Sequence, residues 1–415
     1  MDKSFYEGNR RELYAQLKPG SLLVMFSGHA PRKTNDEDYP YFTNRNFLYL
    51  TGIEQANTIL MTYVGENDYN EKLYILPSDM LAERWTGRRI KAEQAEVLSG
   101  VTSYGYTDTF AAEFDRMFAQ KAIHTICLDI DMSFMADGGS DAHHFAAKMA
   151  KERPHLKIQD LQPLLRKLRT HKKPCEIEAM RKAEIITGAG IEAMMRASRP
   201  GMYEYQYKSE FDYALAQRGV INPGFPSIVS AGENNFCIHY YSYKGQAKDG
   251  DMILNDVGAV WDYEINDVSR AFPCNGKFSD RQKLLYQCAY NTSEHMFKTI
   301  KPGMAMADVD ATIKRYNYEQ LHQAGVCKSF DDIGTYMWHG GAHHVGFDVH
   351  DVVAVPPNAP IEPGMVFCVD IGIYHEEWGI GFRLEDNCLV TEDGCENLSA
   401  KIPRTIEEIE AIMGR

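Results

Sequence analysis

Four acidic residues stand where acidic side chains are unusual, inside segments whose composition predicts β-strands. Asp256 lies in an apolar run, and a buried carboxylate there must be paired, hydrogen-bonded or bound to a metal. A two-residue turn at 261–262 predicts that Asp256 lies opposite Asp267 in a hairpin. A two-residue turn at 377–378 likewise predicts that Asp370 lies opposite Glu385 in a second hairpin.

These two facing pairs concentrate negative charge. Like charges directly opposite each other destabilise a sheet unless a cation or a proton lies between them. Four such carboxylates predict a compensating charge near +4, which two divalent ions would supply. In a dinuclear hydrolytic centre, the metals lower the pKa of a bridging water and polarise the substrate. The carboxylates are therefore interpreted as the base of a two-metal hydrolytic site.

A run of histidines could complete such a site. Four of the 14 histidines lie close together, at His339, His343, His344 and His350. The spacing of the first two would suit a helical zinc site, but Gly340-Gly341 and the lack of a glutamate favour a loop that leads into a strand. Taken alone, each histidine is more often structural than a ligand. Carboxylate-rich sites with one imidazole suit Mn²⁺, Co²⁺ or Fe²⁺, and sometimes Zn²⁺.

The elements that must position these residues fall into two parts. In the first third of the chain, helix-like and strand-like segments alternate, which predicts an α/β layer domain. The expected elements are a helix at 4–17, strands at 21–26, 57–63, 73–76 and 123–128, and a basic helix at 161–173. We place the boundary near the end of that helix and expect domains at 1–168 and 169–415, the second opening with a helix near Glu176 that buries one face.

The second part contains a weak internal repeat. Arg199-Pro200-Gly201-Met202 and Lys301-Pro302-Gly303-Met304 each precede a helical stretch, and Asp256-Val257-Gly258 and Asp370-Ile371-Gly372 each lie in an apolar strand. Chance recurrence of Pro-Gly turns is the alternative. Because the order of elements repeats as well, we expect a pseudo-twofold domain of about 240 residues with a site between its halves.

Composition excludes several classes of function. The chain has 44 Lys and Arg against 58 Asp and Glu, a net charge of −14, so nucleic acid is not an expected partner. No apolar stretch approaches the length of a membrane span, and residues 1–7 lack the apolar core of a signal peptide, so we expect a cytoplasmic protein without a membrane partner. The nine scattered cysteines suit a reducing compartment and are interpreted mostly as small buried apolar side chains.

Several motifs together resemble those of the pita-bread metallopeptidases, specifically aminopeptidase P. In the second part they are Asp256-x-Gly258-Ala259 with Tyr263, Asp267-Val268-Ser269-Arg270, the histidine run from His339 to Asp351, Glu362-Pro363-Gly364-Met365 and Gly381-x-Arg383-x-Glu385-Asp386. In the first part, Phe47-Leu48-Tyr49-Leu50-Thr51-Gly52 and Trp85-Thr86-Gly87-Arg88-Arg89 look like the N-terminal domain of that group, which methionine aminopeptidases lack. The resemblance covers almost the whole chain. It implies an α/β N-terminal domain followed by an α+β pita-bread catalytic domain.

The resemblance implies two metal ions held by Asp256, Asp267, His343, Asp370 and Glu385. Position 370 departs from the pattern, because the family has Glu-Pro-Gly where this chain has Asp-Ile-Gly. The family's glutamate also moves the proton of the bridging water. An aspartate is one methylene shorter, so we expect either a loosely held second metal or a poorly aligned base. The alternative is a carboxylate that only caps a turn.

The resemblance also assigns supporting residues. His239, His339 and His350 match histidines that orient the substrate and stabilise charge on the attacked carbonyl, which imidazole can do. Arg383 lies two residues from Glu385, and Tyr374 lies four residues from Asp370. Even spacings place side chains on the same face of a strand, so both residues are expected on the face of the carboxylates. Arg383 is expected to clamp the carboxylate cluster from below. Tyr374 is expected to be either a packed aromatic side chain or a proton relay.

The resemblance implies a dinuclear metallopeptidase, loaded with Mn²⁺ or alternatively with Co²⁺ or Zn²⁺, that releases the N-terminal residue from peptides with proline in the second position. The alternatives are an Xaa-Pro dipeptidase (a prolidase), a pita-bread amidohydrolase with another substrate, and a peptide-binding protein without catalysis. The family's loop that matches Trp85 and Arg88-Arg89 approaches a neighbouring subunit. A homo-oligomer, dimer or tetramer, is therefore expected.

Overall fold

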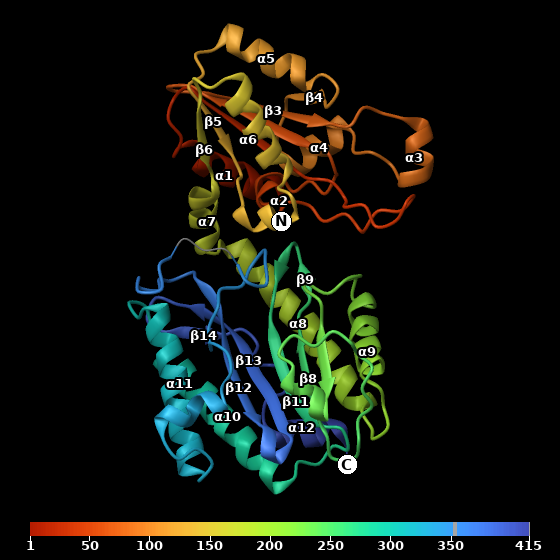
Figure 1. Ribbon diagram of the computed structural model, residues 1–415, viewed down its shortest axis with the longest axis vertical. Coiled ribbons are helices and arrows are strands. Elements are labelled where there is room, and N and C mark those ends of the chain that lie inside the picture. Colours follow the sequence, from red (N-terminus) through yellow and green to blue (C-terminus); the bar gives the residue numbers. More distant parts are fainter. Residues whose placement is uncertain (352–354, 415) are drawn as a thin grey trace. The chain divides into compact units, whose positions relative to one another are not determined.

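The computed structural model describes residues 1–351 and 355–414. The chain forms two compact units, residues 1–168 and residues 169–415 (Figure 1). Among the described residues, no helix is both long enough and apolar enough to cross a membrane.

The first unit is built on a six-stranded mixed sheet in the order β4-β3-β2-β1-β5-β6. Its strands are β1 Ser21–Phe26, β2 Ile59–Val64, β3 Tyr69–Ile75, β4 Tyr104–Tyr106, β5 Thr125–Leu128 and β6 Lys157–Asp160. Its helices are α1 Lys3–Tyr14, α2 Arg45–Thr51, α3 Met80–Thr86, α4 Ala92–Ser99, α5 Phe110–Gln120 and α6 Asp141–Glu152, with the short 3₁₀ helix η1 Met132–Asp137. Helix α7, Gln162–Thr170, runs across the division between the units. The four predicted strands correspond to β1, β2, β3 and β5.

Both faces of this sheet are covered by helices. On one face Leu22 and Val24, two residues apart on β1, pack with Phe114 of α5 and Met149 of α6. On the opposite face, the buried Arg10 of α1 pairs with Glu71 of β3 at 2.8 Å, and it donates to the backbone carbonyls of α2 and α4 at 2.8 Å each. The α/β class predicted for this domain is thereby confirmed.

The second unit contains two three-stranded sheets, β11-β8-β7 and β12-β13-β14, and the two-stranded ribbon β10-β9. Its strands are β7 Ile228–Ala231, β8 Met252–Val257, β9 Val260–Trp261, β10 Glu264–Ile265, β11 Val268–Pro273, β12 Val366–His375, β13 Ile380–Val390 and β14 Cys395–Asn397. Its helices are α8 Pro174–Ala197, α9 Glu204–Ala216, α10 Asp280–Thr299, α11 Met306–Gln323 and α12 Ile406–Met413, with 3₁₀ helices η2 Gly232–Phe236, η3 Phe330–Thr335 and η4 Glu376–Trp378.

The internal repeat is present in this unit. In each half a long helix, α8 or α10, ends at a turn whose glycine has a positive φ, 85° at Gly201 and 93° at Gly303. After each turn an isolated bridge, Tyr203 with Gln246 or Ala305 with residue 360, precedes a second helix, α9 or α11. Each half then supplies an antiparallel hairpin. The pseudo-twofold pita-bread architecture is confirmed.

The register of the first hairpin differs from the prediction. Asp256 on β8 lies opposite Ser269 on β11, and Asp267 comes just before β11. The turn is at Asp262-Tyr263, where φ is 47° and 73°, one residue later than expected. The error moves the pairing by two residues, and side chains alternate with a period of two, so Asp256 and Asp267 still belong to the same face. The predicted pairing of Asp370 with Glu385 is confirmed.

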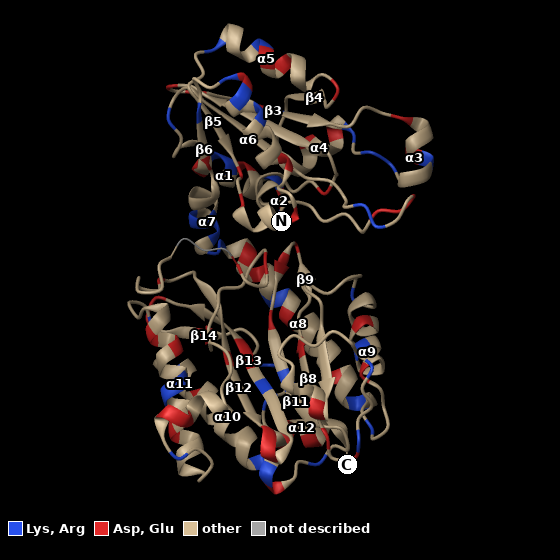
Figure 2. Cartoon of the chain, in the orientation of Figure 1, with Lys and Arg blue, Asp and Glu red and all other residues tan. Residues whose placement is uncertain are grey.

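A buried arginine joins the two hairpins. Arg270 on β11 is fully buried, and it donates to the backbone carbonyl of Glu385 at 2.7 Å and to the carboxylate of Asp386 at 2.7 Å. Figure 2 shows these strands of the second unit carrying charged residues at its centre. Breaking such a buried pair leaves an uncompensated charge, which is strongly destabilising. Arg270 therefore holds β11 beside β13. This brings the carboxylates of the two hairpins close together.

Candidate metal centre

The five predicted metal ligands converge at the centre of the second unit. Nε2 of His343 lies 3.6 Å from Oδ2 of Asp267 and 3.5 Å from Oε1 of Glu385. An N–H···O hydrogen bond is shorter, about 2.7–3.2 Å. Metal bonds of about 2.0–2.2 Å place neighbouring donor atoms of one ion about 3.0–3.6 Å apart. The observed separations therefore fit donor atoms around a cation.

Unpartnered carboxylate oxygens point to the same conclusion. Oδ1 of Asp256, Oδ1 of Asp267 and Oδ1 of Asp370 are buried, and none has a hydrogen-bond partner among the described residues. Leaving a buried charged oxygen without a partner is costly, so a native fold retains such atoms where a ligand or ion satisfies them. Three such atoms in one cluster fit divalent cations.

The electrostatics of the cluster favour a bound cation or a proton shared among the carboxylates. Burial and the neighbouring carboxylates of Glu385 and Asp256 raise the pKa of Asp267 well above its ordinary value. Burial and Glu385 raise the pKa of Asp370 in the same way. Burial also opposes the charge on Glu385, but His343 and Ser269 outweigh it and lower its pKa to about 2. The protein alone thus supports only part of the negative charge that these groups would carry at neutral pH.

His343 is oriented as a metal ligand should be. Its Nδ1 donates to the backbone carbonyl of His344 at 3.3 Å. In the neutral ring this leaves Nε2 as a lone-pair donor that faces Asp267 and Glu385. The assignment of the proton to Nδ1 follows from its carbonyl partner.

Arg383, Tyr374 and His339 form a chain of hydrogen bonds beside the carboxylates. Arg383 Nη2 donates to Asp256 Oδ2 at 2.9 Å, and Nη1 donates to the Tyr374 hydroxyl at 3.1 Å. His339 Nδ1 lies 2.8 Å from the carbonyl of Gly340 and 3.2 Å from Oδ2 of Asp370, so it carries the proton. His339 Nε2, 3.1 Å from the Tyr374 hydroxyl, therefore accepts from it. Burial lowers the pKa of His339 and raises that of Tyr374 to about 12, which keeps both neutral.

The other two predicted histidines lie at the edge of the cluster. His350 packs edge-on against His343, with ring centroids 4.4 Å apart. His239 is exposed, and its ring stacks with Tyr241 at 6.4 Å. His239 also lies close enough that its charge would lower the pKa of His350, which burial already lowers. The structure thus brings His339 and His350 into contact with the cluster, whereas His239 stacks with Tyr241 and reaches the cluster through its charge.

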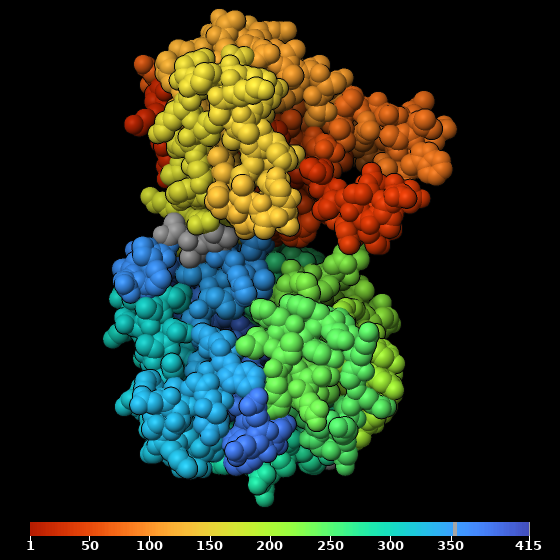
Figure 3. Space-filling view, in the orientation of Figure 1, coloured from red at the N-terminus to blue at the C-terminus, as the bar shows by residue number. Residues whose placement is uncertain are grey.

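Two segments of the second unit meet beside these residues. In Figure 3 the green segment around residue 240 and the light-blue segment around residue 340 lie next to each other on the visible face of the second unit, with darker blue between them. Phe236 and Trp338 join these segments, with ring centroids 5.8 Å apart. Trp338 also stacks on Tyr374 at 4.5 Å. Aromatic rings from both segments therefore pack beside Tyr374, which contacts Arg383 and His339.

Buried charges that the sequence motifs did not reveal hold the histidine loop. Arg169 pairs with Asp348 and with Asp351 at 2.6 Å each, and Lys172 pairs with Asp351 at 2.6 Å. The sequence predicted a basic helix at 161–173, but it did not indicate that Asp348 and Asp351 pair with the basic residues at its end. Along the other side of the loop, the backbone N–H groups of β12 donate to the carbonyls of His343 and residue 341, at 2.7 and 2.8 Å. The loop is thereby held at both ends.

Three further residues of the site were missed. Ser269 donates to Oε2 of Glu385 at 2.8 Å. Asn387 accepts from the backbone N–H of Asp267 at 3.0 Å and donates to its carbonyl at 2.7 Å. Cys368 Sγ belongs to a group, with one donor atom each from Asp267, His343 and Glu385, whose atoms all lie within 4.8 Å of one another. Cys368 lies two residues from Asp370, and Asn387 lies two residues from Glu385. This even spacing could have indicated from the sequence that both side chains belong to the face of the carboxylates.

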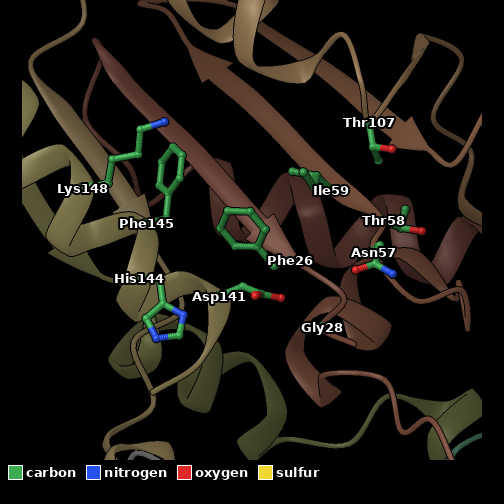
Figure 4. A pocket seen from close by; sticks show the side chains of 10 residues that line it. All are labelled: Phe26, Gly28, Asn57, Thr58, Ile59, Thr107, Asp141, His144, Phe145 and Lys148. Atoms are coloured by element: carbon green, nitrogen blue, oxygen red, sulfur yellow. The ribbon is translucent and has the colours of Figure 1, made fainter. Parts of the chain in front are cut away.

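The first unit has a separate cavity of about 390 Å³ (Figure 4). It is lined by Phe26, Gly28, Asn57, Thr58, Ile59, Thr107, Asp141, His144, Phe145 and Lys148. At its edge Asp141 pairs with His29 at 3.3 Å, and both side chains are substantially exposed. None of these residues belongs to the carboxylate cluster, which is where the chemistry is concentrated.

Comparison with known families gives two matches. The model of metallopeptidase family M24 matches residues 178–392, just over half of the chain. The model of the aminopeptidase P N-terminal domain matches residues 6–126. The first match lies within the second unit, residues 169–415, and the second match lies within the first unit, residues 1–168.

Whole proteins match along their full length. The chain is 29% identical to the Xaa-Pro aminopeptidase of Escherichia coli (strain K12), over 98% of this chain and 97% of that protein. It is similar to the solved structure of an aminopeptidase P candidate from Bacillus anthracis, with a TM-score of 0.96, 34% identity and coverage of 100% of this chain and 98% of the other. It is also similar to the structure of Escherichia coli aminopeptidase P with the inhibitor Pro-Leu, with a TM-score of 0.89, 28% identity and the same coverage.

Proposed function

The chain belongs to metallopeptidase family M24, and on this premise we propose that it is an aminopeptidase that releases the N-terminal residue from peptides with proline in the second position. One observation carries the proposal. Three unpartnered carboxylate oxygens and the Nε2 atom of His343 converge in a fold whose first unit matches the aminopeptidase P N-terminal domain.

We assign the two divalent metal ions to Asp256, Asp267, His343, Asp370 and Glu385. Four carboxylates and one imidazole favour Mn²⁺, with Co²⁺ or Zn²⁺ as alternatives. When bound, such ions lower the pKa of water and polarise the scissile carbonyl.

The chain's own residues supply the rest of the chemistry. We assign Asp370 Oδ1 as the atom that accepts a proton from the attacking water, because Oδ1 has no hydrogen-bond partner among the described residues, whereas Oδ2 lies 3.2 Å from Nδ1 of His339. Arg383 neutralises Asp256 and fixes the Tyr374 hydroxyl, which supports a relay through His339. His350 and His239 are assigned to the substrate carbonyl and its developing charge.

The assembly and location form part of the proposal. Helix α3 has no buried residue, and it exposes Met80, Leu81 and Trp85, the last at 84%. Exposed apolar side chains gathered on one element are typical of a contact surface, so we assign α3 to the interface of a homo-oligomer, a dimer or tetramer. The nine free cysteines support a reducing compartment, the cytoplasm.

Peptide assays on one metal-loaded preparation test the function. Chelated protein is reloaded with Mn²⁺ and given Ala-Pro-Ala, Ala-Pro and Ala-Ala-Ala. We expect cleavage of Ala-Pro-Ala at the bond before proline and little cleavage of Ala-Ala-Ala. Turnover of Ala-Pro alone would instead identify a dipeptidase. A lack of hydrolysis of all three peptides, by protein that has bound two ions, would refute a peptidase with this specificity.

A further inference from the structure

Cys368 lies among the carboxylates and the histidine of the metal centre, and no motif of the sequence predicts it there. It lies on β12 two residues before Asp370, so their side chains belong to the same face of the strand. It is completely buried. Its sulfur lies within 4.8 Å of donor atoms of Asp267, His343 and Glu385. A soft donor atom is therefore among the hard donors of the site.

The surroundings of this sulfur suit a ligand. Asn387 Nδ2 donates to Sγ at 3.4 Å, and the same Nδ2 donates to the carbonyl of Asp267 at 2.7 Å. Hydrogen bonds of this kind orient metal ligands and stabilise charge on them. Oδ1 of Asp267, whose side chain is 5% exposed, is buried without any partner in the same group. That oxygen is an independent sign that a cation belongs there.

We propose that Cys368 is a sulfur ligand of the metal ion bound by Asp267, His343 and Glu385, and that it gives this position a preference for Zn²⁺, Co²⁺ and Fe²⁺ over Mn²⁺. The inference rests on the two-metal centre of the proposed function. Thiolate is a soft donor that favours such ions, whereas carboxylates alone suit Mn²⁺. On binding, the thiol releases its proton to solvent, and a sulfur–metal bond replaces a bond from water to the ion. No atom is oxidised or reduced.

The opposing interpretation is that Cys368 is only a small core residue. It packs in a cluster with Met180, Val345 and Val366, which a purely apolar role would explain. That role does not account for the amide donor on Sγ or for the carboxylates beside it. The two interpretations differ in what a bound metal contacts, which can be measured directly.

X-ray absorption of zinc-loaded protein decides between them. A zinc–sulfur bond is about 2.3 Å long, against about 2.0–2.2 Å for nitrogen and oxygen ligands. We expect a sulfur shell in the native protein, its loss in Cys368→Ser, and its retention in Cys388→Ser. Cys388 is a matched control, because it is also fully buried but faces away from Glu385 and Asn387 on the same strand. Competition binding should show that Cys368→Ser lowers the affinity for Zn²⁺ relative to Mn²⁺ by about tenfold or more.

Each outcome has a definite meaning. Native protein that binds two zinc ions with only nitrogen and oxygen ligands would refute the role of Cys368 and leave the metal centre intact. A sulfur shell that survives in Cys368→Ser would refute it as well. Protein that binds no divalent ion would refute both this inference and the proposed function. Since the native spectrum alone can overturn the proposal, the test does not depend on a variant that folds.

Discussion

Asp370 and His339 lie side by side in the metal centre, with Oδ2 of the aspartate 3.2 Å from Nδ1 of the histidine. The second oxygen of Asp370, Oδ1, is buried and has no hydrogen-bond partner. His339 also contacts Tyr374, so it links the carboxylate to the chain that ends at Arg383 and Asp256. One oxygen of Asp370 thus lies against the histidine, and we assign the other oxygen to the metals and the water.

Removing this carboxylate should abolish activity. Asp370→Ala is expected to reduce the bound metal from two ions toward one and to lower kcat by about a hundredfold or more, because it removes both a ligand and the proposed base. Elemental analysis and turnover of Ala-Pro-Ala measure the two effects. The control is Glu376→Ala, an exposed carboxylate in the turn of the same hairpin. Unchanged metal content and turnover in Asp370→Ala would show that the residue is neither ligand nor base.

Lengthening the same side chain tests its departure from the family pattern. If Asp370 is one methylene too short for good proton transfer, Asp370→Glu should retain two ions and raise kcat, since small misplacements of a catalytic group are costly. The measurement is kcat at saturating peptide together with metal content. A fall in kcat would mean instead that the packing around Ile371 has adapted the strand to aspartate.

Removing one of the two cations that pair with Asp351 should destabilise the second unit. The side chains of Lys172 and Asp351 are 2% and 0% exposed. Lys172→Met leaves Arg169 as the remaining cation paired with Asp351 and removes the positive charge beside the buried Glu176 and Glu264, so the free energy of unfolding should fall by about 3 kcal/mol. Urea denaturation of metal-free protein measures this change. Lys167→Met, at an exposed position on α7, should stay within about 0.5 kcal/mol of the native protein.

The stability of the metal-free protein should decrease between mildly acidic and mildly alkaline pH. In the folded state the pKa values of Asp267 and Asp370 are raised, so folding retains protons that the unfolded chain releases. The pKa of His343 is also raised, because Glu385 outweighs the effect of burial, and it acts in the same direction. These contributions are complete below the unfolded pKa values and are lost as pH rises through the folded ones. Glu385, with a pKa of about 2, acts only at lower pH.

Thermal unfolding measures this dependence with and without metal. Without metal, Tm should be higher near about pH 5.5 than near about pH 8. With Mn²⁺ the difference should shrink or reverse, because bound cations stabilise the ionised carboxylates. Asp267→Asn should weaken the dependence of the metal-free protein. Equal slopes with and without metal would place the titrating groups elsewhere.

The surface of α3 should control assembly. Trp85→Ser combined with Leu81→Ser removes two exposed apolar side chains, so sedimentation should shift from the oligomer toward a species of 47.2 kDa, the mass of one chain. The matched control is Ile221→Ser, since Ile221 is 85% exposed but lies in the second unit. Assembly that is lost in the control and kept in the double variant would contradict the proposed interface.

The sequence by itself determined which residues share a face within each hairpin. The pairing of Asp370 with Glu385 followed from their separation along the sequence and from a turn midway between them. The turn of the other hairpin was misplaced by one residue, which moved the pairing of Asp256 by two. That error was harmless for the site, because an even shift keeps the same face of a strand. The α/β and pita-bread units were likewise predictable from local patterns and recurring motifs.

Only the tertiary structure decided which distant segments meet. Asn387 lies 120 positions from Asp267, and Lys172 lies 179 positions from Asp351. Cys368 was assigned by its composition to the apolar core, and it became a candidate ligand only when β12 was placed beside Asp267 and His343. Local periodicity specifies the face of an element but not its neighbour, since that choice depends on packing between halves whose contacts are far apart in the chain.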